Sequence, residues 1–145
     1  MSEKSQASCV LIVDDDYYFS TEVLGYHLEK RGFRVLHAYT ACEFEDKWRN
    51  ADVILLDIRI PEKEGAPIDP WGGLNALNKI LGKIKAENKQ YPQLENCIIR
   101  SAHSKDDTTG AAIEVPHYFK WFSPDIPFST IIQTVNEVAE KNKNQ

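Results

Sequence analysis

The side chains of this chain that could do chemistry follow short, mainly apolar runs. These runs cover residues 9–13, 53–56, 97–100 and 118–119. The residues that come directly after them are Asp14, Asp15 and Asp16, then Asp57, then Ser101 and Ala102, and finally Lys120. Such runs between helical patterns are typical of buried parallel strands, and the ligands of a doubly wound sheet gather at the carboxyl ends of its strands. We therefore expect the acids, the hydroxyl and the ammonium group to converge on one cleft.

These stretches resemble the receiver domain of two-component response regulators, and the resemblance covers about residues 9–140. The matching stretches are residues 11–15, 55–61, 99–102 and 118–120, in that order. The resemblance implies that acidic residues after the first and third strands hold a magnesium ion. It also implies that Asp57 accepts a phosphoryl group from a histidine kinase or a histidine phosphotransfer protein, and that Ser101 and Lys120 contact the phosphoryl oxygens. The resemblance further implies a phosphoacceptor that phosphorylates itself and loses the phosphoryl group slowly, rather than a turnover enzyme.

The residues themselves support a magnesium site. Carboxylates gathered in one cleft repel one another and are costly unless a cation joins them, and Mg²⁺ prefers six oxygen ligands, several of them water. We expect Asp15 and Asp57 to bind the ion directly. Asp14 is expected to bind it through water, and the carbonyl oxygen of Arg59 to be its backbone ligand. Charge on the phosphoryl group would be met by the ion, the hydroxyl, the ammonium group and backbone N–H groups near Ala102.

The composition fits one globular domain. The chain has 145 residues, of which 42% are hydrophobic and 27% are charged, and its formal net charge is −5. The negative charge argues against a nucleic-acid-binding surface, and no apolar stretch approaches the roughly 18 residues of a membrane span. Residues 1–8 are polar and lack the apolar region of a signal peptide. Because the three cysteines show no metal or redox spacing, we expect reduced thiols in a cytoplasmic protein. From the charge and the apolar runs, we expect neither nucleic-acid nor membrane partners.

Strand and helix patterns alternate along the chain. The predicted strands are residues 9–13, 33–38, 53–56, 97–100 and 118–120, and the predicted helices lie near residues 17–31, 40–50, 74–84 and 128–138. Gly32 stands where a helix C-terminal cap is favoured, and Thr40 opens a capping-box pattern. The alternation predicts an α/β fold with a doubly wound, five-stranded parallel sheet of the flavodoxin-like (βα)5 receiver type. Residues 9–140 would form this domain, 1–8 a disordered tail and 141–145 a frayed tail.

Two regions depart from the receiver pattern. Receivers usually have a proline, joined by a cis bond, after the lysine of strand five, whereas Trp121 follows Lys120 here. A cis bond before a non-proline residue costs roughly 2.5–4 kcal/mol, so this bond is either strained or trans, and a trans bond would shift Lys120. Residues 105–116 offer too few apolar positions for more than about two helical turns, which predicts a shortened fourth-helix region. His117 stands where receivers often have an aromatic residue.

The long loop at residues 61–73 follows the proposed phosphorylation site and is rich in proline and glycine. Trp71 in this loop is a large apolar side chain suited to a contact hot spot. One hypothesis is that a separate protein partner reads phosphorylation through this loop. The other interpretation is that the loop is a passive insertion, with Trp71 packed on the third helix.

Two further functions stay open. A pseudo-receiver, which is a purely protein-binding domain of the same fold, is favoured by Trp121 and by the reduced fourth-helix region, and disfavoured by the intact acids, hydroxyl and ammonium group. A small phosphohydrolase similar to the haloacid dehalogenase group would use Asp14 and Asp16 as its first motif, but this leaves Asp57 unexplained. The residue that carries the covalent phosphate, Asp14 or Asp57, discriminates between these functions. No output domain follows the last predicted helix, so we expect an unknown downstream protein to be reached through protein contacts.

Overall fold

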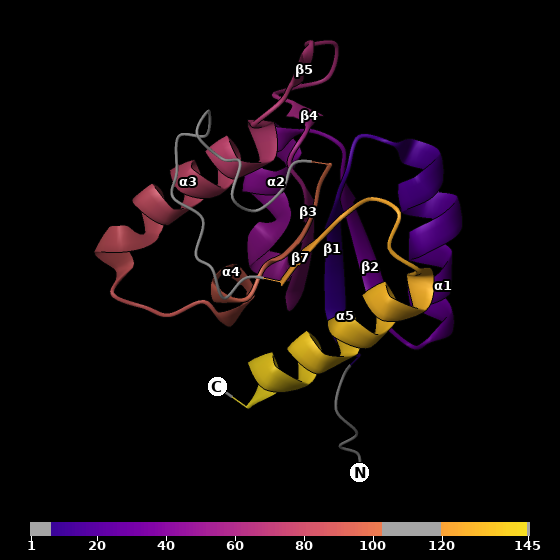
Figure 1. The fold of residues 1–145 in the computed structure, drawn as a ribbon. Helices are drawn as coiled ribbons and strands as arrows, with labels where there is room; N and C mark the ends of the chain where they lie inside the picture. Colours follow the sequence, from indigo (N-terminus) through magenta and orange to yellow (C-terminus); the bar gives the residue numbers. More distant parts are fainter. Residues whose placement is uncertain (1–6, 103–119, 145) are drawn as a thin grey trace.

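The chain folds around one parallel sheet. The computed structural model describes residues 7–102 and 120–144. Five strands form the sheet in the order β2-β1-β3-β6-β7, and all neighbouring pairs are parallel (Figure 1). Their bounds are β1 Cys9–Val13, β2 Arg34–Ala38, β3 Val53–Asp57, β6 Ile98–Arg100 and β7 Lys120–Phe122. The predicted doubly wound, five-stranded parallel sheet is therefore confirmed, and its strand order reverses between β1 and β3, where ligands bind in such sheets.

Helical segments cover both faces of the sheet. They are the π-helical η1 Tyr18–Gly25, then α1 Tyr26–Lys30, α2 Ala41–Lys47, α3 Gly72–Ile84, α4 Pro92–Glu95 and α5 Phe128–Lys143, with short 3₁₀ turns at η2 Trp48–Asn50 and η3 Lys85–Glu87. Side chains alternate along β1, so Leu11 packs in the cluster that contains Phe44 of α2, whereas Ile12 packs with Val135 of α5 on the other face. No helix within residues 7–102 and 120–144 is long and apolar enough to cross a membrane.

The two predicted helix ends near β2 are present. Gly32 has a φ of 93°, and its N–H donates to the carbonyl of Glu29, so it ends the first helix in the left-handed conformation that glycine adopts readily. The Thr40 hydroxyl accepts a hydrogen bond from the N–H of Glu43 at 3.1 Å, and the Glu43 carboxylate accepts one from the N–H of Tyr39. These local bonds fix where β2 passes into α2.

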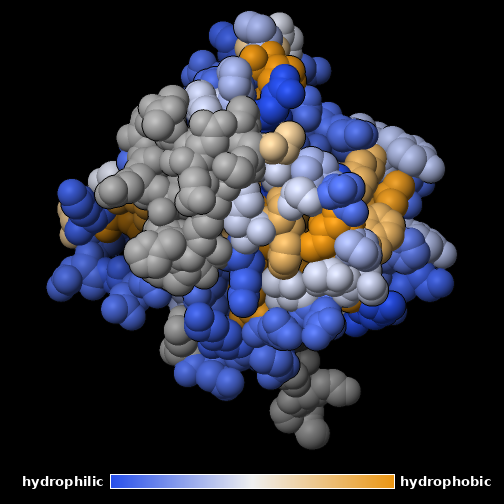
Figure 2. All heavy atoms as spheres, viewed as in Figure 1, coloured by the Kyte–Doolittle hydropathy of each residue, from blue (hydrophilic) through white to orange (hydrophobic). Residues whose placement is uncertain are grey.

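A small antiparallel hairpin follows β3. It consists of β4 (Ile60–Pro61) and β5 (Ile68–Asp69), and it extends beyond the sheet at the top of Figure 1. The space-filling view shows apolar atoms on this hairpin, where Ile68 is 41% exposed (Figure 2). The sequence predicted only a loop here, because two-residue strands leave no periodic pattern.

The structure differs from the predicted elements at two further points. The last strand begins at Lys120 and ends at Phe122, whereas the sequence predicted that it ends at Lys120. Helix α5 continues to Lys143, beyond the predicted helix end near residue 138, and its last turn is held by the Asn142 side chain, which donates to the carbonyl of Asp52 at 2.7 Å. The predicted short helix at 105–116 and His117 lie outside the described residues.

Candidate functional site

Three carboxylates meet where β1 and β3 end. Asp14 directly follows β1, Asp57 is the last residue of β3, and the register of these adjacent strands places Val13 beside Leu56. Asp14, Asp15 and Asp57 each offer an oxygen atom, and these atoms all lie within 4.8 Å of one another. The structure thus brings together the three predicted metal-binding side chains.

Burial and mutual repulsion act on this carboxylate cluster. Burial is the main cause that raises the pKa of Asp14 to about 7, and the charge of Asp57 adds to it. Burial also raises the pKa of Asp57 to about 6, although the hydrogen bond from the N–H of Arg59 at 3.2 Å opposes this rise. The pKa of Asp15 is raised as well, again mainly by burial. A set of hard oxygen ligands that is costly to ionise together fits the requirements of Mg²⁺.

Ser101 and Ala102 follow β6 on the other side of Asp57. Ser101 is 3% exposed, and its N–H donates to the carbonyl of Phe122 at 2.9 Å, which holds this turn against β7. A hollow of about 270 Å³ opens over the site. Its lining residues are Asp15, Asp57, Arg59, Ile68, Arg100, Ser101, Ala102 and Pro124. The predicted hydroxyl and backbone contacts therefore share one hollow with the predicted phosphoacceptor.

Lys120 does not lie in this hollow. The register of β7 places it beside Ile98 at the start of β6, whereas Arg100 at the end of β6 lies beside Asp57. Two residues of strand separate these positions by roughly 6.6 Å. Lys120 instead lines a hollow of about 180 Å³ with Glu137 and Lys141 of α5. The described residues contain no cis peptide bond, so the bond from Lys120 to Trp121 is trans, and Lys120 lines a different hollow from Asp57.

Arg100 is the cationic side chain that the sequence analysis missed. Its Nη1 lies 3.6 Å from Oδ2 of Asp14, and its Nη2 donates to the carbonyl of Pro124 at 2.9 Å. The guanidinium carbon stands 4.2 Å from the centre of the Phe19 ring, a cation–π geometry. A charged residue that closes an apolar run was a usable signal, because a buried strand seldom holds an arginine without a partner.

Asp16 caps the segment that follows β1 and does not join the cluster. Its carboxylate accepts from the N–H of Phe19 at 3.0 Å, while its own N–H donates to the carboxylate of Asp14 at 2.9 Å. This is the helix-capping role that single aspartates most often have. An Asp14 and Asp16 pair facing one substrate, as a dehalogenase-like motif requires, is therefore not formed.

Helix α3 supports Asp57 from behind. The N–H of Gly73 donates to the carbonyl of Ile58 at 2.7 Å. A Cβ at Gly73 would stand 2.5 Å from the carbonyl oxygen of Asp57 and 3.1 Å from Cα of Ile58. The helix can approach the end of β3 this closely only because residue 73 has no side chain.

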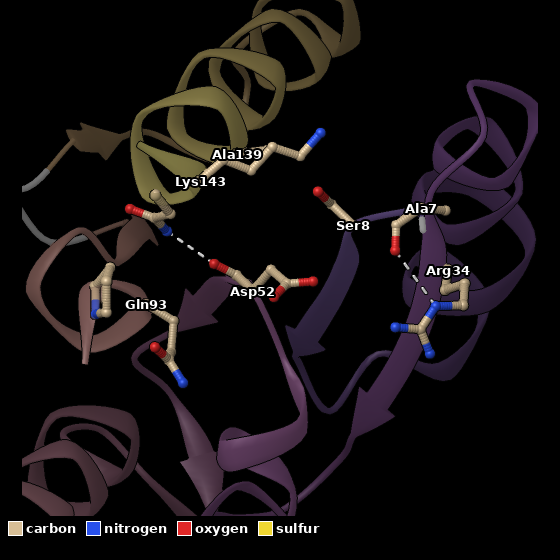
Figure 3. Close-up of a pocket in the computed structure, with 9 residues that line it drawn as sticks. Ala7, Ser8, Arg34, Asp52, Gln93, Ala139 and Lys143 are labelled. Atoms are coloured by element: carbon tan, nitrogen blue, oxygen red, sulfur yellow. Dashed lines mark hydrogen bonds between the residues drawn. The ribbon is translucent and has the colours of Figure 1, made fainter. Parts of the chain in front are cut away.

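A second hollow lies at the opposite, amino-terminal edge of the sheet. It has a volume of about 420 Å³, and Figure 3 shows Arg34, Asp52 and Lys143 around it. Its polar groups serve structural contacts: Asn142 donates to the carbonyl of Asp52, and Nε of Arg34 donates to the carbonyl of Ala7 at 3.4 Å. This hollow lacks the carboxylate cluster, so it is not the candidate site despite its larger volume.

Known proteins resemble this chain in structure. No family model matches the chain, and no curated protein matches it in sequence. The fold is that of response regulator receiver domains. A CheY-like receiver domain protein from Methanospirillum hungatei has a TM-score of 0.68 and 19% identity, with 96% of this chain and 98% of that chain covered. The receiver domain of the Francisella response regulator 1452 has a TM-score of 0.65 and 22% identity, with 92% and 98% covered. A receiver domain protein from Clostridium thermocellum has a TM-score of 0.63 and 20% identity, with 94% and 97% covered.

Proposed function

We propose that this chain is a phosphoacceptor signalling module that takes a phosphoryl group onto Asp57. The observation that carries the proposal is the position of Asp57, which ends β3 inside the carboxylate cluster and lines one hollow with Ser101 and Ala102. The proposed donor is a histidine kinase or a histidine phosphotransfer protein. A downstream protein of unknown identity would receive the signal through protein contacts.

In the proposed reaction, a carboxylate oxygen of Asp57 attacks the phosphorus atom of a phosphohistidine. The new O–P bond forms as the P–N bond breaks, and the imidazole nitrogen keeps the electron pair of the broken bond. The hydrogen bond from the N–H of Arg59 to Oδ1 of Asp57 holds the carboxylate in a defined orientation for this attack.

The remaining groups of the site would meet the charge of the phosphoryl oxygens. Ser101 and Ala102 line the same hollow as Asp57, which supports the Ser101 hydroxyl and the Ala102 backbone N–H as the proposed donors. Asp14, Asp15, Asp57 and the carbonyl of Arg59 would hold Mg²⁺ there. When bound, the ion supplies positive charge that neutralises both the carboxylates and the transferring group.

A pseudo-receiver remains a second candidate because of one observation. Lys120, which the sequence placed among the phosphoryl contacts, lines a different hollow. If no other cation takes over that contact, the site would hold a phosphoryl group poorly, and the domain would act by protein binding alone.

Intact mass spectrometry after incubation with acetyl phosphate and Mg²⁺ tests the proposal. The parent protein is expected to gain the mass of one phosphoryl group, and peptide mapping is expected to place it on Asp57. The variant Asp57→Asn should show no gain, and Asp15→Asn should show a much smaller one. A label that persists in Asp57→Asn, or one that maps to Asp14, contradicts the proposal, and an unlabelled parent favours the pseudo-receiver.

A further inference from the structure

Arg100 occupies the place at the sheet edge where a phosphoryl group on Asp57 would need a cation. The two residues are direct neighbours in the parallel register of β3 and β6. Both line the hollow above the carboxylate cluster, together with Ser101 and Ala102. Arg100 therefore belongs to the same strand end as the groups proposed to bind the phosphoryl oxygens.

The Arg100 guanidinium is held in position but weakly paired. Its contacts with the carbonyl of Pro124 and the ring of Phe19 fix the plane of the group. Its distance of 3.6 Å to the carboxylate of Asp14 exceeds that of a charge-assisted hydrogen bond, which is about 2.7–2.9 Å. Within the described part of the chain, its buried Nε has no hydrogen-bond partner. A group arranged in this way retains donor capacity for an oxyanion.

We propose that Arg100 is the cation that binds the phosphoryl oxygens on Asp57, in place of Lys120. The inference rests on the proposed phosphorylation of Asp57. Arginine presents several N–H donors in a planar fork that matches phosphoryl oxygens, so a guanidinium can replace an ammonium group in this task. When phosphorylation adds negative charge at Asp57, the guanidinium moves its interaction from Asp14 to the phosphoryl oxygens.

Arg59 also lines the hollow, but the structure favours Arg100 over it. The Arg59 residue is exposed, whereas the Arg100 side chain is only 18% exposed and belongs to β6, which has a neighbouring strand on each side. An ion pair formed at the less exposed position is screened less by water and salt, and a smaller loss of side-chain freedom accompanies it.

The test compares the binding of Mg²⁺ with the binding of beryllofluoride, a phosphoryl mimic, in four variants. Arg100→Met keeps the apolar contact with Phe19 but removes the charge, and Arg100→Lys restores a charge without the fork. The matched controls are Lys120→Met in the hollow beside α5 and Lys143→Met in the amino-terminal hollow. Circular dichroism melting verifies that each variant is folded.

Arg100→Met is expected to bind beryllofluoride at least tenfold more weakly in saturating Mg²⁺, and its affinity for Mg²⁺ alone is expected to be unchanged or higher. The opposite directions follow because Arg100 competes with the metal ion for Asp14 but attracts the phosphoryl mimic. Arg100→Lys should recover part of the loss, and both controls should stay within twofold of the parent. The rate of phosphorylation by phosphoramidate is expected to follow the same order.

Three results would overturn the inference alone. The first is that Arg100→Met binds beryllofluoride within twofold of the parent affinity. The second is a tenfold loss of beryllofluoride affinity in either lysine control. The third is an equal loss of Mg²⁺ and beryllofluoride affinity in Arg100→Met, which would indicate a structural role. A parent that neither binds beryllofluoride nor takes a label on Asp57 would overturn the proposed function as well, so the two failures are distinguishable.

Discussion

Among single residues, Asp14 shows the strongest conflict between burial and charge. Its side chain is 6% exposed, and the carboxylates of Asp15 and Asp57 lie close by. The guanidinium of Arg100 offsets only part of this repulsion, because it stands 3.6 Å away. The folded state without a bound cation is consequently less stable than its packing alone would make it.

Replacing Asp14 with asparagine is expected to stabilise the metal-free protein at neutral pH by on the order of 1 kcal/mol, because it removes one of three clustered charges. Asparagine keeps an oxygen for the hydrogen bond from the N–H of Asp16. Millimolar Mg²⁺ should raise the melting temperature of the parent and raise that of Asp14→Asn much less. Urea unfolding in EDTA and melting curves in Mg²⁺ measure the two effects. A parent melting curve that Mg²⁺ leaves unchanged contradicts the proposed metal site.

His37 gives the stability of the fold a pH dependence away from the site. Its Nδ1 is hydrogen-bonded to the hydroxyl of Ser20 at 2.8 Å, and burial is the main cause that lowers the pKa of the ring, with Lys47 adding to it and Glu29 opposing it. At a pH below the ordinary pKa of 6.5, this histidine is protonated in the unfolded chain but largely neutral in the folded chain, where its pKa is lower. Unfolding therefore takes up a proton, and the contribution of His37 to stability is lost as pH falls below 6.5.

The carboxylate cluster also titrates near this range, so the measurement compares the parent with His37→Gln at each pH between 5 and 8. The difference in free energy of unfolding between the parent and His37→Gln is expected to be constant above about pH 7. It should become smaller as the pH falls toward 5. An advantage that stays constant or grows toward acid pH would show that His37 is not held in its neutral form by the fold.

The positions of Asp14, Asp15, Asp57 and Ser101 could be predicted from the sequence, because each directly follows an apolar run that forms a strand. Arg100 was missed because it was counted as part of such a run. Lys120 was misplaced for a related reason. Apolar residues stand on both sides of it, so the pattern could not indicate which side was the strand.

Among the elements, helix α3 lies closest behind the end of β3, where Asp57 stands. Gly72 and Gly73 begin this helix, and both lie so close to the backbone of residues 57–60 that a Cβ would collide with it. Gly82 lies in the same helix but has nothing within 4 Å of its Cβ position. Substitutions at these three glycines can therefore separate the effect of the close approach of α3 to residues 57–60 from the effect of helix propensity.

Gly73→Ala is expected to destabilise the protein by about 1–3 kcal/mol, because the new methyl group displaces the backbone of Asp57. It should also slow phosphorylation by acetyl phosphate. The matched control Gly82→Ala should stabilise the fold by about 0.5–1 kcal/mol through helix propensity alone and leave phosphorylation unchanged. Chemical denaturation and mass spectrometry measure both quantities. Equal effects of the two substitutions would mean that the close approach of α3 has no importance for the site.

Within the described residues, the β4–β5 hairpin reaches the hollow over the carboxylate cluster from outside the sheet. Ile68 lines the hollow and is 41% exposed, whereas Trp71 is only partly exposed and packs against the core. Trp71 is thus less suited to a partner contact than the sequence suggested, and Ile68 is better suited. The hypothesis that a partner reads phosphorylation through the loop at residues 61–73 stays a prediction.

Hydrogen exchange with and without beryllofluoride examines this prediction. Amides of residues 60–69 are expected to gain protection in the bound state, because the mimic enters the hollow that Ile68 lines. The amino-terminal hollow around Asp52 and Asn142 serves as an internal control and should show no change. Changes confined to residues 103–122 would instead contradict the hypothesis that this hairpin responds.

The existence of most elements followed from sequence, but several of their ends did not. The capping box at Thr40 and the terminal glycine Gly32 were predictable because they use local hydrogen bonds. The extension of α5 was not, since it depends on contacts of Asn142 with Asp52 and Asn96, which are distant in sequence. Helix ends that depend on local hydrogen bonds can be predicted from a few neighbouring residues, whereas ends that depend on tertiary contacts cannot.

At the scale of the whole molecule, the two faces of the sheet explain why the fold was predictable. The central strands β1 and β3 are buried along almost their full length, and the residues of each divide between two apolar clusters. A parallel sheet covered on both sides requires such continuous apolar runs. The strand order then brings the ends of β1, β3 and β6 together, so the location of the site follows from the topology.

The near balance of charge around this edge also has a kinetic consequence. Asp14, Asp15 and Asp57 face Arg59 and Arg100, which gives the group a formal charge of −1 without a divalent cation and +1 with one. An anionic phosphate donor is therefore repelled in the first state and attracted in the second. Added salt screens both encounters, so it should speed the first and slow the second. For the proposed site, we therefore expect the cation to bind before the donor, because only then is the local charge at this edge positive.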